Sequence, residues 1–217
     1  MGVKERQERD REAVARSILD AARELFTQEG YRNVSIRKIA ERIEYSPAAI
    51  YGYFPSKDDI FLALAEEGFR LLARWEAGRA RTGTRIDVIR SAFWALYTFS
   101  KAHPEYYALM FLDRSVPQLS QDWERFGFVR EMKRKLADLI QEAIAAGDFP
   151  AETSADAVFR ILLAAVHGVA TMRLCDRLAP GEDGDTLAHD TVEAALVGLR
   201  TGFIHTYRPA SCTDPCS

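Results

Sequence analysis

Apolar residues recur along most of the chain at intervals of three or four, and sustained alternation of apolar and polar residues is absent. This spacing places apolar side chains on one face of an α-helix. Residues that can cap a helix N-terminus stand just before several of these runs, namely Ser35, Ser46, Ser56, Thr84 and Ser154. The pattern therefore predicts an all-α fold of about nine helices.

The first apolar stripe extends from Val14 to Phe26 and stops before Gly30, a residue suited to a helix C-terminus. Proline interrupts the pattern at His103-Pro104, because the residue before proline avoids the helical region. The later helices are expected at Asp58–Arg79, from Thr84 onward, and at Tyr106–Leu112, Trp123–Ala146, Ala155–Arg177 and Thr186–Tyr207.

Composition limits the class of protein. Of the 217 residues, 47% are hydrophobic, which is enough to fill a core and excludes a disordered or collagen-like chain. No stretch approaches about 20 uninterrupted apolar residues, and no signal segment is recognised at the start. Three cysteines argue against a disulfide framework. We expect a soluble, cytoplasmic protein without a membrane partner.

Charge is unevenly divided along the chain. Residues 1–57 contain 11 basic and 9 acidic residues, whereas the remainder contains 18 basic and 23 acidic residues. A mildly basic head on an acidic body suits a small nucleic-acid-binding part, although ordinary charge scatter explains the numbers equally well.

Two short helices between Ser35 and Phe54 are separated by Ile43-Glu44-Tyr45-Ser46, which is the spacing of a helix-turn-helix motif. In this motif the second helix enters the major groove, and a free helix N-terminus binds phosphate. The candidate DNA-binding residues are basic, hydroxyl-bearing or small: Arg37, Ser46, Pro47, Ala48, Ala49, Tyr51, Tyr53 and Lys57. For the two tyrosines, partial burial in the core is the alternative.

Residues Arg16 to Glu67 resemble the TetR family of transcriptional regulators. The matching segments are Ile18-Leu19-Asp20-Ala21-Ala22, Leu25-Phe26, Gly30-Tyr31, Ser35-Ile36-Arg37-Lys38-Ile39-Ala40 and Ile50-Tyr51-Gly52-Tyr53-Phe54-Pro55-Ser56-Lys57. The resemblance implies contacts to DNA, mainly to its backbone, from Ser35, Arg37, Ser46, Ala48, Ala49, Tyr51, Tyr53 and Lys57. It also implies a DNA-binding domain at residues 1–57 and a ligand-binding and dimerisation domain at residues 58–217.

Two positions depart from the family pattern. Glu44 stands where the family usually has glycine, so a turn of the usual shape would cost about 1–2 kcal/mol in left-handed backbone strain. Pro47-Ala48-Ala49 lacks the basic or threonine side chains often found there. We therefore expect Tyr51 and Arg37 to carry more of the DNA recognition.

The segments His103–Phe111 and Ala165–Ala170 resemble a C-terminal domain type often marked by a Trp-His-Gly triplet, with Val166 here in place of the tryptophan. The resemblance implies a ligand pocket among the fourth to eighth helices. Its candidate lining is aromatic or sulfur-containing, Phe93, Trp94, Tyr97, Tyr107, Met110, Phe111, Phe126 and His167. The alternative for each is plain core packing, and His167 has three open roles: core histidine, dimer contact or ligand partner.

The last two predicted helices are too apolar for a monomer surface. In the resembled family such helices form a two-fold four-helix bundle, here through Ala164, Ala165, Gly168, Leu196, Leu199 and Phe203. Two-fold symmetry implies a palindromic operator with recognition helices about 34–36 Å apart. The expected function is a homodimeric repressor of such an operator, released by a small, largely apolar effector, with helix 58–79 as the lever.

Two other classes of function were weighed. An enzyme is disfavoured because no catalytic or phosphate-binding motif is present, and no catalytic residue, cofactor or metal is expected. The histidines lack metal-ligand spacing. A redox sensor acting through Cys175, or through Cys212 and Cys216 in the tail, would respond to thiol oxidation rather than to a ligand.

Overall fold

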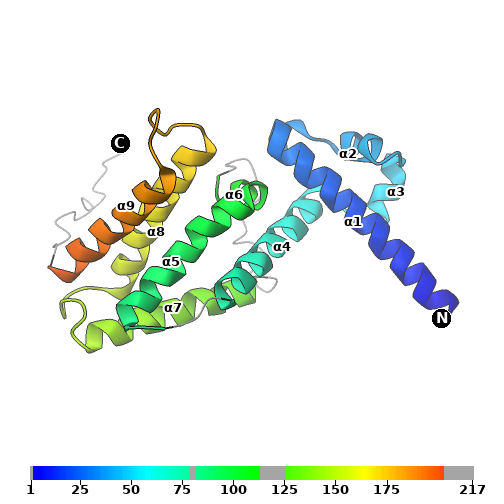
Figure 1. Ribbon diagram of the computed structural model, residues 1–217. Coiled ribbons are helices and arrows are strands. Elements are labelled where there is room, and N and C mark those ends of the chain that lie inside the picture. The colour runs from blue at the N-terminus through cyan, green and yellow to red at the C-terminus, as the bar shows by residue number, and fades with distance from the viewer. Residues whose placement is uncertain (1, 79–81, 113–125, 203–217) are drawn as a thin grey trace, which may run out of the picture.

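The computed structural model describes residues 2–78, 82–112 and 126–202, and all regular structure in these ranges is helical (Figure 1). This confirms the predicted all-α fold class. The helices are α1 (Val3–Glu29), a 3-10 turn η1 (Tyr31–Asn33), α2 (Ile36–Arg42), α3 (Pro47–Tyr51), α4 (Lys57–Ala77), α5 (Arg85–Ala102), α6 (Pro104–Phe111), α7 (Gly127–Ala145), α8 (Ala155–Leu174) and α9 (Gly184–Arg200).

The predicted capping residues start the helices that follow them. In each case the side-chain oxygen accepts a hydrogen bond from the backbone N–H three residues later, as observed for Ser35, Ser46, Ser56, Thr84 and Ser154. These bonds satisfy backbone donors that have no partner within the helix. The last helix begins earlier than predicted, because Asp183 rather than a residue near Thr186 is its cap.

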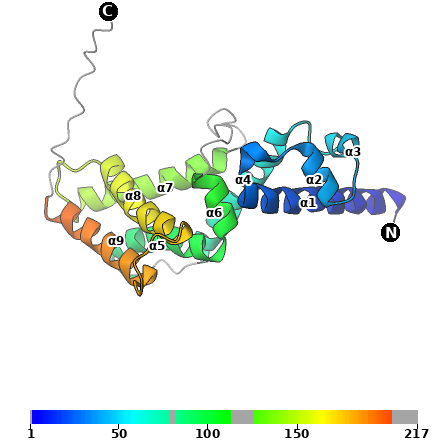
Figure 2. The same ribbon diagram turned by 90° about the horizontal axis from the view of Figure 1, so that it is seen from above.

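Helices α1, α2 and α3 form a head at one end of the molecule, α5 to α9 form a body at the other, and α4 runs between them (Figure 1). The head packs around Ile18, Phe26, Ile39, Ile50 and Phe61, all of which are buried. The first turns of α1 project beyond α2 and α3 in both views (Figure 2) and are exposed.

In the body, α8 packs against α5, α7 and α9. Within the described residues, α8 is the only helix whose length and apolar composition would suffice to cross a membrane, a criterion that core helices also meet. Asp156, Arg160 and Arg173 lie within it. Its apolar residues Val158, Leu162 and Val166 are fully buried, so α8 supplies part of the body's core.

The turn between α2 and α3 has the left-handed shape that the family resemblance implied at Glu44. Glu44 has a φ of 60°, in the left-handed region where glycine is unstrained. The Tyr45 N–H donates to the Ala40 carbonyl at 2.9 Å and closes the turn. The left-handed backbone at Glu44 therefore belongs to the turn of the helix-turn-helix motif itself.

Replacing Glu44 with glycine should stabilise the protein by about 0.5–1 kcal/mol, because relief of left-handed strain exceeds the added entropy of the unfolded chain. Urea denaturation measures the change. The matched control is Glu41→Gly, which removes the same charge from a helical position and should destabilise by about 1 kcal/mol. Equal effects of both substitutions would contradict the assignment of strain to Glu44.

Candidate DNA-binding surface and ligand cavity

The second helix of the motif, α3, has one buried and one exposed face. Ile50 is fully buried and anchors α3 to the head. Pro47, Ala48 and Tyr51 point away from the core, and Tyr51 is 55% exposed. The exposed face therefore offers small apolar side chains and one large hydroxyl-bearing ring, which suit thymine methyl groups and phosphates respectively.

Two of the polar candidates, Ser35 and Ser46, stand at the starts of α2 and α3. Ser35 and Ser46 are exposed caps, and their oxygens accept N–H bonds from Lys38 and Ala49 at 3.2 and 3.1 Å. Each hydroxyl keeps a proton that it can donate to a phosphate oxygen.

Arg37 is the most accessible basic candidate, with 80% of its side chain exposed. Its Nε lies 2.8 Å from Glu41 Oε1, one turn further along α2. A surface ion pair of this kind contributes little free energy. Arg37 can therefore exchange Glu41 for a DNA phosphate at small cost.

Tyr53 and Lys57 are held by contacts inside the head. Tyr53 is half-buried, with the Arg11 guanidinium 5.0 Å above its ring. Lys57 Nζ donates to the carbonyls of Tyr31 and Val34, both at 2.9 Å, and lies 4.1 Å from the Tyr31 ring centre. Lys57 thus ties the segment before α2 to the start of α4, a structural role that the sequence pattern did not reveal.

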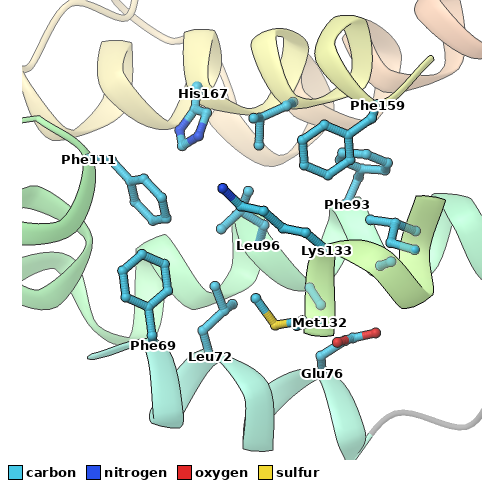
Figure 3. Close-up of a pocket in the computed structure, with 14 residues that line it drawn as sticks. Phe69, Leu72, Glu76, Phe93, Leu96, Phe111, Met132, Lys133, Phe159 and His167 are labelled. Atoms are coloured by element: carbon cyan, nitrogen blue, oxygen red, sulfur yellow. The ribbon is translucent and has the colours of Figure 1, made fainter. Parts of the chain in front are cut away.

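A cavity of about 280 Å³, just below the usual range for small-molecule sites, lies between α4 and the helices of the body (Figure 3). Helices α4, α5, α6, α7 and α8 all contribute to its wall. The lining is predominantly apolar, with two charged side chains and one histidine among Phe69, Leu72, Glu76, Ala92, Phe93, Ala95, Leu96, Phe111, Met132, Lys133, Leu136, Phe159, Leu163 and His167.

Three of the predicted pocket residues, Phe93, Phe111 and His167, line this cavity. The other five lie elsewhere. The Tyr97 hydroxyl donates to Asp185 Oδ1 at 2.9 Å, and Trp94 packs 5.2 Å from Tyr97 on the side that faces α9. Aromatic content identified the right helices but did not distinguish their faces.

The remaining predicted pocket residues support the wall from behind. Phe126 packs edge-on against Phe69 at 6.0 Å. Met110 fills the space beside Gly68, where a Cβ atom would come 2.5 Å from its sulfur. Gly68 thereby lets α4 and α6 approach closely. Tyr107 is fully buried directly behind His167.

His167 is hydrogen-bonded through Nδ1 to the Tyr107 hydroxyl. Burial raises the pKa of Tyr107 and lowers the pKa of His167, so both groups are neutral at pH 7. Among the described residues, the Tyr107 hydroxyl has no other acceptor, so it donates to Nδ1. The neutral imidazole then carries its proton on Nε2. His167 is therefore both a hydrogen-bonded core histidine and part of the cavity wall.

Head and body meet at a polar junction beside the cavity. Arg16 of α1 donates to both carboxylate oxygens of Glu67 on α4, at 2.8 and 2.9 Å. Arg23 of α1 donates to the Tyr106 hydroxyl on α6 at 3.0 Å. Glu67 lies two residues before Phe69, and Tyr106 lies on the helix that supplies Phe111. These contacts join α1 directly to α4 and α6, two of the helices that contribute to the cavity wall.

Exposed small or apolar side chains occur on both α8 and α9. They are Ala164, Gly168 and Met172 on α8 and Ala194 and Val197 on α9, and are called the exposed strip below. Ala165 borders this strip and is half-buried.

Two of the residues predicted for a dimer interface, Leu196 and Leu199, are buried in the core of the subunit itself. Phe203 lies outside the described residues. The exposed positions of α9 lie on the opposite side of the helix from these leucines.

The groups considered for other chemistry lie apart from these surfaces. Cys175 is exposed at the end of α8, and Cys212 and Cys216 lie outside the described residues. No group of three or more potential metal ligands occurs in the part of the chain that the structure describes.

The fold and the exposed α3 face define a helix-turn-helix protein with a separate helical domain around a cavity. Residues 18–64 match the sequence pattern described as bacterial regulatory proteins of the tetR family. Residues 89–195 match the pattern described as the tetracyclin repressor-like C-terminal domain. The chain therefore belongs to the tetR family of bacterial regulatory proteins.

The relatives of this chain include transcriptional repressors. The HTH-type transcriptional repressor Rv1474c of Mycobacterium tuberculosis is 34% identical over 74 residues, covering 34% of this chain and 40% of the repressor. The repressor AcnR of Corynebacterium diphtheriae is 34% identical over 88 residues, covering 41% of this chain and 40% of AcnR. The chain thus matches about two fifths of the length of each.

Similarity in structure extends over most of the chain. A Rhodococcus sp. RHA1 protein of unknown function is 27% identical, with a TM-score of 0.66 over 86% of this chain and 95% of that protein. This likeness includes both the head and the body.

Replacing Tyr107 with phenylalanine should destabilise the protein by about 1–3 kcal/mol, because His167 Nδ1 would lose its hydrogen bond in a buried position. Denaturant unfolding followed by circular dichroism measures the loss. Tyr45→Phe is the control, since Tyr45 is 44% exposed and should change stability by less than about 0.5 kcal/mol. Equal stability of both variants would contradict the buried hydrogen bond.

Proposed function

We propose that the protein is a homodimeric transcriptional repressor that binds a palindromic operator and is released by a small, largely apolar effector. The observation that carries the proposal is the course of α4. This helix begins in the DNA-binding head at Lys57 and supplies Phe69, Leu72 and Glu76 to the cavity wall. An effector in the cavity would therefore contact the same helix, α4, that begins in the DNA-binding head.

The proposed DNA contacts are made by the exposed side of the motif. Tyr51 and Arg37 supply a hydroxyl and a guanidinium, while Ser35, Ser46 and the N-terminus of α3 bind phosphates. Pro47, Ala48 and Ala49 lie flat in the major groove. Tyr53 and Lys57 contribute mainly by holding the motif together, and Lys57 retains one donor for a phosphate.

The effector acts through its differential affinity for two arrangements of the heads. Occupation of the cavity shifts α4 and α6, and the Arg16–Glu67 and Arg23–Tyr106 contacts transmit the shift to α1. Coupling between two such sites typically amounts to about 1–3 kcal/mol. That range corresponds to a reduction of DNA affinity by about 5- to 150-fold.

The proposed dimer forms through the exposed strip of α8 and α9. Small side chains at Ala164 and Gly168 allow close approach of a second copy, and Met172, Ala194 and Val197 supply apolar area. A two-fold axis between the strips gives a four-helix bundle. In this proposal residues 1–57 bind DNA, and residues 58–217 bind the effector and form the dimer. The protein acts in the cytoplasm.

Substituting alanine for Tyr51 or Arg37 should weaken operator binding at least about ten-fold, because each change removes a charge-assisted or hydroxyl contact to DNA. Fluorescence anisotropy with a DNA fragment selected from a random pool measures the affinity. Arg134→Ala on α7 is the control for the loss of one arginine. Unchanged binding by both head variants would refute this surface.

Replacing Gly168 with glutamate should convert the dimer into folded monomers. A Cβ at Gly168 meets nothing within 4 Å in its own subunit, so the larger side chain is tolerated there but places charge in the proposed bundle. Light scattering should report 24.5 kDa in place of twice that mass. The control Ala145→Glu, on the exposed end of α7, should remain dimeric. A Gly168→Glu variant that stays dimeric would contradict the proposed interface.

A further inference from the structure

We infer that the effector is an amphipathic carboxylate, with its anionic head held by Lys133 and His167 and its apolar body enclosed by the aromatic side chains of the cavity. The inference rests on the proposed function, because it names the chemical class of the effector of that same cavity. It is carried by two donors, Lys133 and His167, in a wall whose other members apart from Glu76 are apolar (Figure 3).

Lys133 is an exposed residue of α7 whose side chain extends across the cavity, with its nitrogen toward the end where Phe111 and His167 lie (Figure 3). Its neighbours on α7 are neutralised, since Arg134 pairs with Glu131 and Asp138, and Lys135 pairs with Glu131. Within residues 2–78, 82–112 and 126–202, no carboxylate pairs with Lys133. The ammonium is therefore available to an anion that enters the cavity.

His167 provides the second donor. Its Nδ1 accepts from Tyr107, which leaves the proton on Nε2. Among the described residues, no acceptor is bound to Nε2. A carboxylate has two oxygens, so one can accept from the ammonium and the other from the imidazole N–H. An amide or alcohol of the same shape satisfies only part of this arrangement.

The other charged group in the wall does not oppose an anion at this position. Glu76 lies at the far edge of the cavity from the Lys133 nitrogen (Figure 3) and has an interaction of its own. The rings of Phe93 and Phe159 pack 5.9 Å apart beyond the lysine stem. They, with Phe69 and Leu72, form the surface against which an apolar tail is buried.

The test compares three ligands that share one ten-carbon tail and differ in charge: decanoate, decan-1-ol and decylammonium. Isothermal titration with the full-length protein, in the absence of DNA, measures their affinities. Decanoate should bind at least about ten-fold more tightly than the alcohol, and decylammonium most weakly, because only the carboxylate accepts from both donors.

Lys133→Met keeps the apolar stem and removes the charge. It should abolish the preference for decanoate and leave the affinity for decan-1-ol unchanged. Lys135→Met, the same substitution two residues away, should retain the preference. Equal affinities for the three ligands in the wild-type protein, absence of decanoate binding, or an unchanged preference in Lys133→Met would each overturn the inference.

Operator release is measured separately, by adding decanoate to the protein–DNA complex. Tight, charge-selective binding without release would support the carboxylate site and refute the proposed coupling to DNA. Release by decanoate that Lys133→Met prevents would support both.

Discussion

A single continuous helix links the two halves of this molecule. Helix α4 is fixed at its start, where Lys57 binds the carbonyls of Tyr31 and Val34, and it forms part of the cavity wall further along, at Phe69 and Leu72. Gly68 lets α6 pack closely on this helix, and the Arg16–Glu67 pair joins it to α1. Because a helix is stiff, a displacement at one end changes the position of the other.

The parts of the fold that depend on local chemistry could be predicted from the sequence. Ser35, Ser46 and Ser56 cap the helices that they precede, and the left-handed turn at Glu44 agrees with the glycine that the resembled family usually has there. These features depend on interactions within a few residues. The family resemblance added the two-domain organisation, which periodicity by itself does not supply.

The cavity could be predicted only in part, because its lining depends on how distant helices are rotated against one another. Phe93, Phe111 and His167 were identified, whereas Tyr97 and Trp94 face α9 and Tyr107 stands behind His167. The sequence did not indicate Lys133 or Phe69 as cavity residues. For Lys133 the reason is that a lysine on an amphipathic helix has the pattern of a solvent-exposed face. Likewise, the apolar residues of α9 have the same sequence pattern whether they pack in the subunit's own core or against a partner subunit.

The central claim is that two copies bind one duplex, with each α3 in a successive major groove. Double electron–electron resonance between spin labels at residue 48 of the two subunits, in a variant lacking the native cysteines, tests it directly. With operator DNA bound, the account predicts a single narrow distance distribution consistent with recognition helices about 34–36 Å apart. A sample without any intersubunit distance, or with the same broad distribution with and without DNA, would contradict it.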